Sequence, residues 1–190
     1  MSDQPPGPLG PDDERVQRLL ARIRDVPDFP KPGIVFKDIT PLLADHATFT
    51  EVIDALAQPF AAAGVDTVAG IEARGFVLGA PVALELGAGF VPVRKQGKLP
   101  GTTVTASYEL EYGSAVLEVT SDAFLAGARV LVVDDVLATG GTVAAAVDLV
   151  RQCGGEVVGV SMLMELGFLD GRAALAAAGV EEDLHVLLRV

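Results

Sequence analysis

Two adjacent carboxylates end the apolar run in VLVVDDVLATGGT, residues 130–142, and a turn rich in glycine and threonine follows them. Asp134 and Asp135 could accept hydrogen bonds from the hydroxyl groups of a sugar. The turn could bind an anion, because glycines let successive N–H groups approach it and a helix dipole favours negative charge. Carboxylates would repel that anion, so the two features together predict a phosphorylated sugar. The turn consists of Ala138, Thr139, Gly140, Gly141 and Thr142.

An ordinary strand-to-helix turn is the alternative interpretation of this segment, with the two acids and Thr142 as solvated caps. VLVVDD alone does not distinguish between the two interpretations, because many strands end in acidic residues. The whole segment is more specific, and it is not one of the common nucleotide-binding loops. Neither GxxxxGK[ST] nor a GxGxxG after an expected strand is present.

The composition limits the kinds of partner. The formal net charge of −12 argues against a nucleic acid or an anionic membrane. The longest charge-free stretch, residues 136–147, is shorter than the ~18 apolar residues that a membrane-spanning helix needs. The single cysteine, Cys153, is expected to pack near a helix end and agrees with a reducing cytoplasm. The presence of only two histidines argues against a zinc site.

Strand-like and helix-like segments alternate from residue 12 onward. The spacing of Val16, Leu19, Leu20 and Ile23 predicts a helix over 12–26, after which prolines impose an extended segment. Residues 96–113 read as a long loop or an extended hairpin. Expected strands are 66–71, 89–95, 114–119, 129–135, 156–164 and 184–190, and further helices are expected over 49–63, 76–87, 142–154 and 171–178.

This alternation predicts an α/β fold with a mostly parallel twisted sheet flanked by helices. We expect a single domain over residues 12–190, preceded by a disordered tail over 1–11 that is rich in proline and glycine and lacks the features of a signal peptide. In such sheets ligands bind at the carboxyl ends of the strands, where Asp134 and Asp135 would lie.

Four segments resemble the type I phosphoribosyltransferases, in particular their adenine-specific members: FPKPGIVFKDITPLL (29–43), IEARGFVLGAPVALELG (71–87), VPVRKQGKLPGTTVTASYELEYG (91–113) and VLVVDDVLATGGT. The resemblance extends over residues 16–171. It implies a purine-salvage enzyme that transfers the 5-phosphoribosyl group of phosphoribosyl pyrophosphate to adenine, giving AMP and pyrophosphate. It also implies Mg²⁺ held mainly by the substrate, a cytoplasmic location and a homodimer.

The resemblance assigns the phosphoribosyl and pyrophosphate contacts. The turn over 138–142 would hold the 5-phosphate, and Asp134 and Asp135 the ribose hydroxyls. Arg74 would lie in a pyrophosphate loop, where members of this fold often carry a cis peptide bond not followed by proline. The basic cluster would balance the charge of pyrophosphate, its alternative being an ordinary solvated turn; its members are Arg94, Lys95 and Lys98.

The resemblance also implies a base-binding segment over 27–43 and a lid over 95–113. The backbone of Val35 would read the edge of adenine and Phe36 would stack on it. Lys37 stands where relatives often have arginine, and its role is open because lysine lacks the planar fork. The lid would keep water from the reacting ribose.

Within the lid, Glu111 is the expected catalytic carboxylate, handling the purine proton, and Tyr112 is adjacent to it. Alternatively, Glu109 and Glu111 only line the solvated face of a strand.

Two alternatives to an adenine-specific enzyme are a sibling transferase that uses hypoxanthine, guanine or xanthine, and a transcriptional regulator that keeps the fold as an effector-binding module. The negative net charge and the lack of length for a DNA-binding domain disfavour the regulator.

Overall fold

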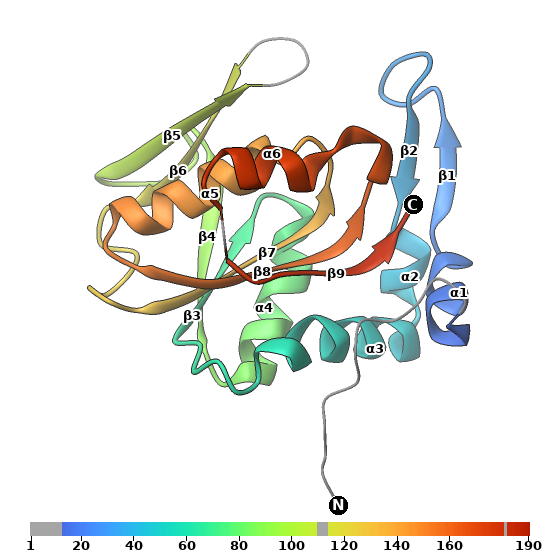
Figure 1. Ribbon diagram of the computed structural model, residues 1–190, viewed down its shortest axis with the longest axis horizontal. Coiled ribbons are helices and arrows are strands. Elements are labelled where there is room, and N and C mark those ends of the chain that lie inside the picture. Colours follow the sequence, from blue (N-terminus) through green and yellow to red (C-terminus); the bar gives the residue numbers. More distant parts are fainter. Residues whose placement is uncertain (1–12, 110–113, 181) are drawn as a thin grey trace, which may run out of the picture.

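A seven-stranded sheet forms the centre of the protein (Figure 1), which is described by a computed structural model over residues 13–109, 114–180 and 182–190. The spatial order of the strands is β5-β6-β4-β3-β7-β8-β9. Strands from β4 to β9 in this order run parallel, whereas β6 pairs antiparallel with β4 and β5. The predicted mostly parallel sheet is confirmed. The strands are β3 Thr67–Ile71, β4 Gly89–Lys95, β5 Thr103–Glu109, β6 Ser114–Thr120, β7 Arg129–Leu137, β8 Glu156–Glu165 and β9 Leu184–Arg189.

Helices cover both faces of this sheet (Figure 1). One face packs against α3 and α4, and the other against α5 and α6. No helix in the described part of the chain is long and apolar enough to cross a membrane. The helices are α1 Glu14–Leu20, α2 Thr40–Ala44, α3 His46–Ala57, α4 Arg74–Leu86, α5 Gly141–Gln152 and α6 Gly171–Ala177, with 3₁₀ turns η1 Gln58–Phe60 and η2 Gly167–Leu169.

The central strand β7 shows how the sequence positions the site. Val130 and Val132 face the core beneath α5, and Leu131 and Val133 face the core beneath α3 and α4. All four are completely buried. Side chains alternate between the faces of a strand, so an unbroken apolar run suits a strand covered on both sides. Its burial in the middle of the sheet places the two acids that follow at the carboxyl edge.

The predicted helix over 12–26 is wrong in its second half. Helix α1 ends at Leu20, and residues 24–27 form β1 (Arg24–Pro27), which pairs antiparallel with β2 (Val35–Asp38). Two cross-strand ion pairs accompany this register, Arg24 with Asp38 and Lys37 with Asp25. The pairing with a distant segment therefore overrides the local helical spacing.

The segment predicted as a lid contains an ordered strand, which confirms the hairpin alternative. β5 pairs with β6 in continuous register from Thr103 opposite Thr120 to Glu109 opposite Ser114. Ala106 of β5 is buried, so this part of the hairpin is fixed to the sheet. Residues 110–113, which include Glu111 and Tyr112, lie outside the described residues, as does the predicted tail over 1–11.

Candidate active site

The predicted anion-binding turn lies between the end of β7 and the start of α5. Gly140 has φ +85°, and a Cβ atom at this position would lie 2.8 Å from the carbonyl oxygen of Gly171. Glycine is therefore required both by the backbone and by the packing of α6. No described side chain caps α5. An open pocket of about 220 Å³ lies over the turn, lined by Val136, Leu137, Ala138, Thr139, Gly140, Thr142 and Val143.

Asp134 and Asp135 are both buried at the carboxyl end of β7. The backbone N–H of Asp135 donates to Asp134 Oδ1 at 2.8 Å. Gly75 in the first turn of α4 closes over the pair, because a Cβ there would lie 2.8 Å from the same Asp134 oxygen. Asp135 Oδ2 is buried, and its contact among the described residues is an ion pair with the Arg74 guanidinium rather than a hydrogen bond of good geometry. A carboxylate oxygen has more than one lone pair, so it could also accept from a hydroxyl group.

Burial dominates the electrostatics of this pair. Burial, and then repulsion by Asp135, raise the pKa of Asp134 well above its usual range. Burial also raises the pKa of Asp135, although the Arg74 guanidinium opposes that rise. A ligand that donates hydrogen bonds to these two buried carboxylates would stabilise their charged forms.

Arg74 connects three parts of the site that are far apart in the sequence. Its Nη2 lies 2.8 Å from Asp135 Oδ2, and its Nη1 donates to the carbonyl oxygen of Lys37 at 3.2 Å. Its Cζ lies 4.9 Å from the centre of the Phe36 ring, within the range of a cation–π contact. The peptide bond between Glu72 and Ala73, just before it, is cis, as the resemblance implies.

The segment predicted to bind the base lies on the β1–β2 hairpin. Phe36 packs edge to face against Phe29, with 5.2 Å between ring centres. Val35 is 51% exposed and lies opposite Pro27, which has no N–H group to donate to the Val35 carbonyl. That carbonyl receives no hydrogen bond from its register partner. The Lys37 ammonium pairs with Asp25 at 2.7 Å, so Lys37 faces the site through its backbone carbonyl.

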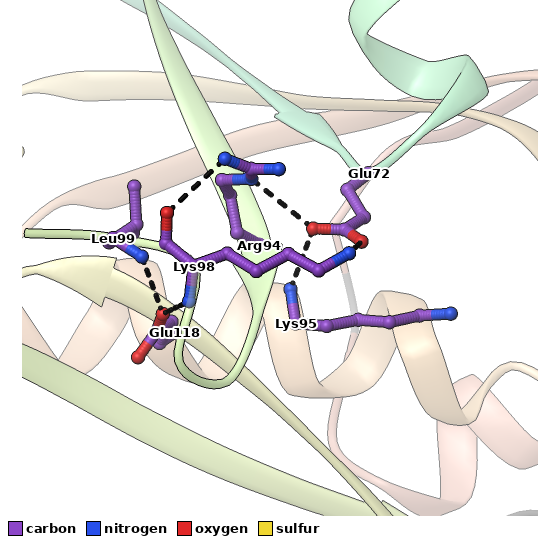
Figure 2. A network of polar contacts seen from close by, with 6 residues as sticks. All are labelled: Glu72, Arg94, Lys95, Lys98, Leu99 and Glu118. Atoms are coloured by element: carbon purple, nitrogen blue, oxygen red, sulfur yellow. Dashed lines mark hydrogen bonds and ion pairs between the residues drawn. The ribbon is translucent and has the colours of Figure 1, made fainter.

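The three predicted cations of the basic cluster lie at the end of β4 and in the turn that follows (Figure 2). The Arg94 guanidinium lies 3.3 Å from Glu72 Oε2, and the Lys98 ammonium pairs with Glu72 Oε1. The backbone N–H of Lys95 also donates to Glu72, at 3.0 Å. The Lys95 ammonium points away from this carboxylate in Figure 2.

Glu118 is a second carboxylate in this network, and it is buried. Its Oε1 accepts from the backbone N–H groups of Lys98 at 2.8 Å and Leu99 at 2.9 Å (Figure 2). Further hydrogen bonds come from the Gly97 backbone and the Thr103 side chain. Burial alone would raise the pKa of Glu118, but these donors lower it. Glu118 therefore fixes the backbone of the turn that carries Lys98.

Sequence reasoning identified the cations of this site but missed several residues that position them. Glu72 stands inside a quoted motif, and Glu118 lies in an expected strand, but neither residue was assigned a role. Gly75 and Gly171, which pack against Asp134 and the anion-binding turn, gave no signal that distinguishes them from other glycines.

The site as a whole brings together the predicted anion-binding turn, a buried pair of carboxylates, a basic cluster and the exposed start of β2. The predicted residues Phe36, Arg74 and Asp135 are joined by direct contacts. Chemically, this arrangement suits a phosphorylated sugar with a second anionic group and a planar base. The expected catalytic residue Glu111 and its neighbour Tyr112 stay predictions.

Comparisons with known proteins agree with this geometry. The family model described as a phosphoribosyl transferase domain matches residues 38–175. An adenine phosphoribosyltransferase from Streptomyces coelicolor is 60% identical over 172 residues, which cover 90% of this chain and 94% of that protein. A crystal structure of the adenine phosphoribosyltransferase from Rhodothermus marinus is 49% identical, with a TM-score of 0.88 over 93% of this chain and 98% of that one. The enzyme from Saccharomyces cerevisiae, solved with adenine and an imino-altritol bisphosphate, is 41% identical, with a TM-score of 0.84 over 92% and 98% of the two chains.

Proposed function

The chain belongs to the adenine phosphoribosyltransferase family, and from this premise we propose how its residues share the work of the reaction. The enzyme acts in purine salvage and transfers the 5-phosphoribosyl group of phosphoribosyl pyrophosphate to adenine, forming AMP and pyrophosphate. One observation supports our assignment above the others. Arg74 joins the strand assigned to the base with the carboxylate assigned to the ribose.

The donor's 5-phosphate binds in the turn over 138–142. The uncapped start of α5 supports this assignment, because its N–H groups and dipole favour an anion. Thr139 and Thr142 belong to this turn and line its pocket, where they add hydroxyl donors. Asp134 and Asp135 accept hydrogen bonds from the ribose hydroxyls, with Asp135 Oδ2, which also pairs with Arg74, as one acceptor. The donor is thereby fixed at both ends of its sugar.

The pyrophosphate group binds to the four cations Arg74, Arg94, Lys95 and Lys98. In the reaction the bond between C1 of the ribose and the pyrophosphate oxygen breaks, and the electron pair leaves with pyrophosphate. The cations stabilise this charge as it develops. N9 of adenine forms the new bond to C1, and Glu111 takes the proton that N9 loses.

Mg²⁺ is expected to enter with the donor. Within the described residues, no group of three or more His, Cys, Asp or Glu side chains is placed to hold a metal. This fits an ion held mainly by pyrophosphate and ribose oxygens and by water, as Mg²⁺ commonly is. When bound, the ion supplies positive charge to the leaving group. The cytoplasmic location and the homodimer belong to this proposal as further expectations.

Adenine binds along β2, with Phe36 against its face and the backbone of Val35 at its edge. The position of Val35 supports this assignment, because Val35 is exposed and its register partner Pro27 has no N–H group to occupy the Val35 carbonyl, which could accept from the amino group of adenine. In the described structure Arg74 covers one face of the Phe36 ring. The base therefore stacks on the ring either from the other side or after Arg74 turns towards the pyrophosphate.

The direct test is a transfer assay. With phosphoribosyl pyrophosphate, Mg²⁺ and adenine, the protein should form AMP and pyrophosphate in equal amounts, measured by chromatography and a coupled phosphate assay. Without a base, pyrophosphate release should be slow, because the expected lid over 95–113 would keep water from the reacting ribose. Steady release of pyrophosphate at the same rate with and without adenine would contradict the transfer reaction and indicate a hydrolase.

A further inference from the structure

The cations assigned to pyrophosphate are already bound to a carboxylate of the protein. Arg94 and Lys98 both contact Glu72, which also accepts the Lys95 N–H group (Figure 2). The Glu72 side chain is only 7% exposed, so solvent screens these contacts weakly. Burial alone would raise the pKa of Glu72, but its contacts with Lys98, the Lys95 N–H and Arg94 outweigh burial and lower that pKa. The carboxylate is therefore anionic at neutral pH.

We propose that Glu72 is an internal counter-ion that occupies the place of pyrophosphate on Arg94 and Lys98 and so promotes release of this product. The inference rests on the proposed function, because it takes these cations as the pyrophosphate site. Pyrophosphate binds only by drawing Arg94 and Lys98 away from Glu72. Its departure returns both cations to that carboxylate.

Glu118 makes such an exchange of partners feasible. It holds the backbone N–H groups of Lys98 and Leu99, and the Arg94 guanidinium donates to the Lys98 carbonyl at 3.2 Å. The backbone of the turn is thus fixed, while the Lys98 side chain is 46% exposed. Its flexible stem can move the ammonium from one anion to another without a rearrangement of the turn.

The network also carries more positive than negative charge, so a bound anion would neutralise the excess. Arg94, Lys95 and Lys98 carry three positive charges, and Glu72 balances one of them. The carboxylate of Glu118 accepts hydrogen bonds from the backbone N–H groups of Lys98 and Leu99 instead of pairing with these side chains. Pyrophosphate carries more negative charge than Glu72 and so can displace it, but Glu72 lowers the net attraction that pyrophosphate meets.

The test compares Glu72→Gln with the wild-type enzyme by isothermal titration with magnesium pyrophosphate. Glutamine keeps the size and the acceptor for the Lys95 N–H but removes the charge. The Kd should fall by about threefold to tenfold, as expected for the loss of one like charge a few ångströms away in a partly solvated site. Inhibition of AMP synthesis by pyrophosphate should become stronger by a similar factor.

AMP provides the internal control, because it carries the phosphate, the ribose and the base but no pyrophosphate. Its Kd should be the same in both proteins, whereas a general disturbance of the site would change it. Glu156→Gln removes the same charge from the opposite edge of the sheet, where Glu156 pairs with Arg129, and should change neither Kd. Glu72→Ala, a second variant, should tighten pyrophosphate binding in the same direction.

Unchanged or weaker pyrophosphate binding in both Glu72 variants, with normal AMP binding, would overturn the inference and make Glu72 a residue that only orients its cations. Absence of pyrophosphate binding by the wild-type enzyme would instead contradict the proposed site itself. The two failures are therefore distinguishable.

Discussion

Replacement of Asp134 by asparagine should make the protein more stable and much less active. Asp134 is buried with Asp135 as its neighbour, and both burial and this like charge raise its pKa. Asparagine removes the cost of holding a second charge there and keeps an acceptor for the Asp135 N–H. We expect a gain on the order of 1–2 kcal/mol in the free energy of unfolding, or roughly 2–8 °C in Tm.

The stability gain should depend on pH. A group whose pKa is raised on folding contributes its full stability below its unfolded pKa, and this contribution is lost as the pH rises through the folded value. Ionisation of Asp134 therefore destabilises the folded wild-type protein mainly at alkaline pH. The difference in Tm between Asp134→Asn and wild type should be larger at about pH 8 than at about pH 5. A difference that grows towards acid pH would contradict the burial argument.

The same substitution should lower kcat/KM for the donor by roughly tenfold to a hundredfold, because a hydrogen bond to a charged acceptor contributes about 1.5–3 kcal/mol. The matched control is Asp148→Asn. Asp148 is exposed on α5 and contacts only Gln152 among the described residues, so its loss should leave both Tm and turnover nearly unchanged. Full activity of a stabilised Asp134→Asn protein would exclude Asp134 from ribose binding.

The largest loss of turnover is expected for Glu111→Gln. This residue is assigned to the proton on N9 of adenine, and removal of a general acid–base group typically lowers the rate by ~10²–10⁴-fold. Glutamine has nearly the same size but cannot take a proton. The value of kcat should fall by this factor, while the Kd of the donor, measured by titration, stays near the wild-type value.

Glu109→Gln is the matched control, since Glu109 ends β5 and precedes Glu111 by two residues in the sequence. If both glutamates line only a solvated face, neither substitution will change kcat. A loss confined to Glu111→Gln identifies the catalytic carboxylate. An equal loss in both variants would show that the hairpin as a whole, and not one proton acceptor, limits turnover.

The sequence allowed prediction of those parts of the fold whose pattern is local. The apolar run before Asp134 suits a strand buried on both faces, and the glycine-rich turn after it precedes a helix, so the elements that carry the proposed phosphoribosyl site follow from consecutive residues. β1 could not be predicted this way. The spacing up to Ile23 is helical, and only the pairing of Arg24–Pro27 with a segment ten residues further on makes the next residues a strand.

The contacts that organise the cations were also beyond local reasoning. Glu72 and Lys98 are 26 residues apart, and Arg74 reaches the Lys37 carbonyl across 37 residues. The role of Glu118 could not be predicted, because its donors include backbone N–H groups of Lys98 and Leu99 that no sequence pattern reveals. Such contacts depend on the order of strands in the sheet, which brings β4 next to β6.

The choice of base tests the central claim most directly. Adenine has an amino group at C6 and an unprotonated N1, whereas hypoxanthine has a carbonyl and a protonated N1. A backbone carbonyl of Val35 facing the amino group, with an N–H facing N1, suits adenine at both positions and hypoxanthine at neither. Unpaired buried polar groups cost roughly 1–3 kcal/mol each, so two mismatches give about a hundredfold discrimination or more.

The measurement is kcat/KM for adenine and for hypoxanthine, at saturating phosphoribosyl pyrophosphate, in the wild-type enzyme and in Phe36→Ala. Stacking on Phe36 does not distinguish the two purines, so the variant should use adenine less efficiently but keep the preference. We predict a ratio of about a hundred or more in favour of adenine in both proteins. Comparable efficiency with both bases in the wild-type enzyme would contradict the adenine assignment.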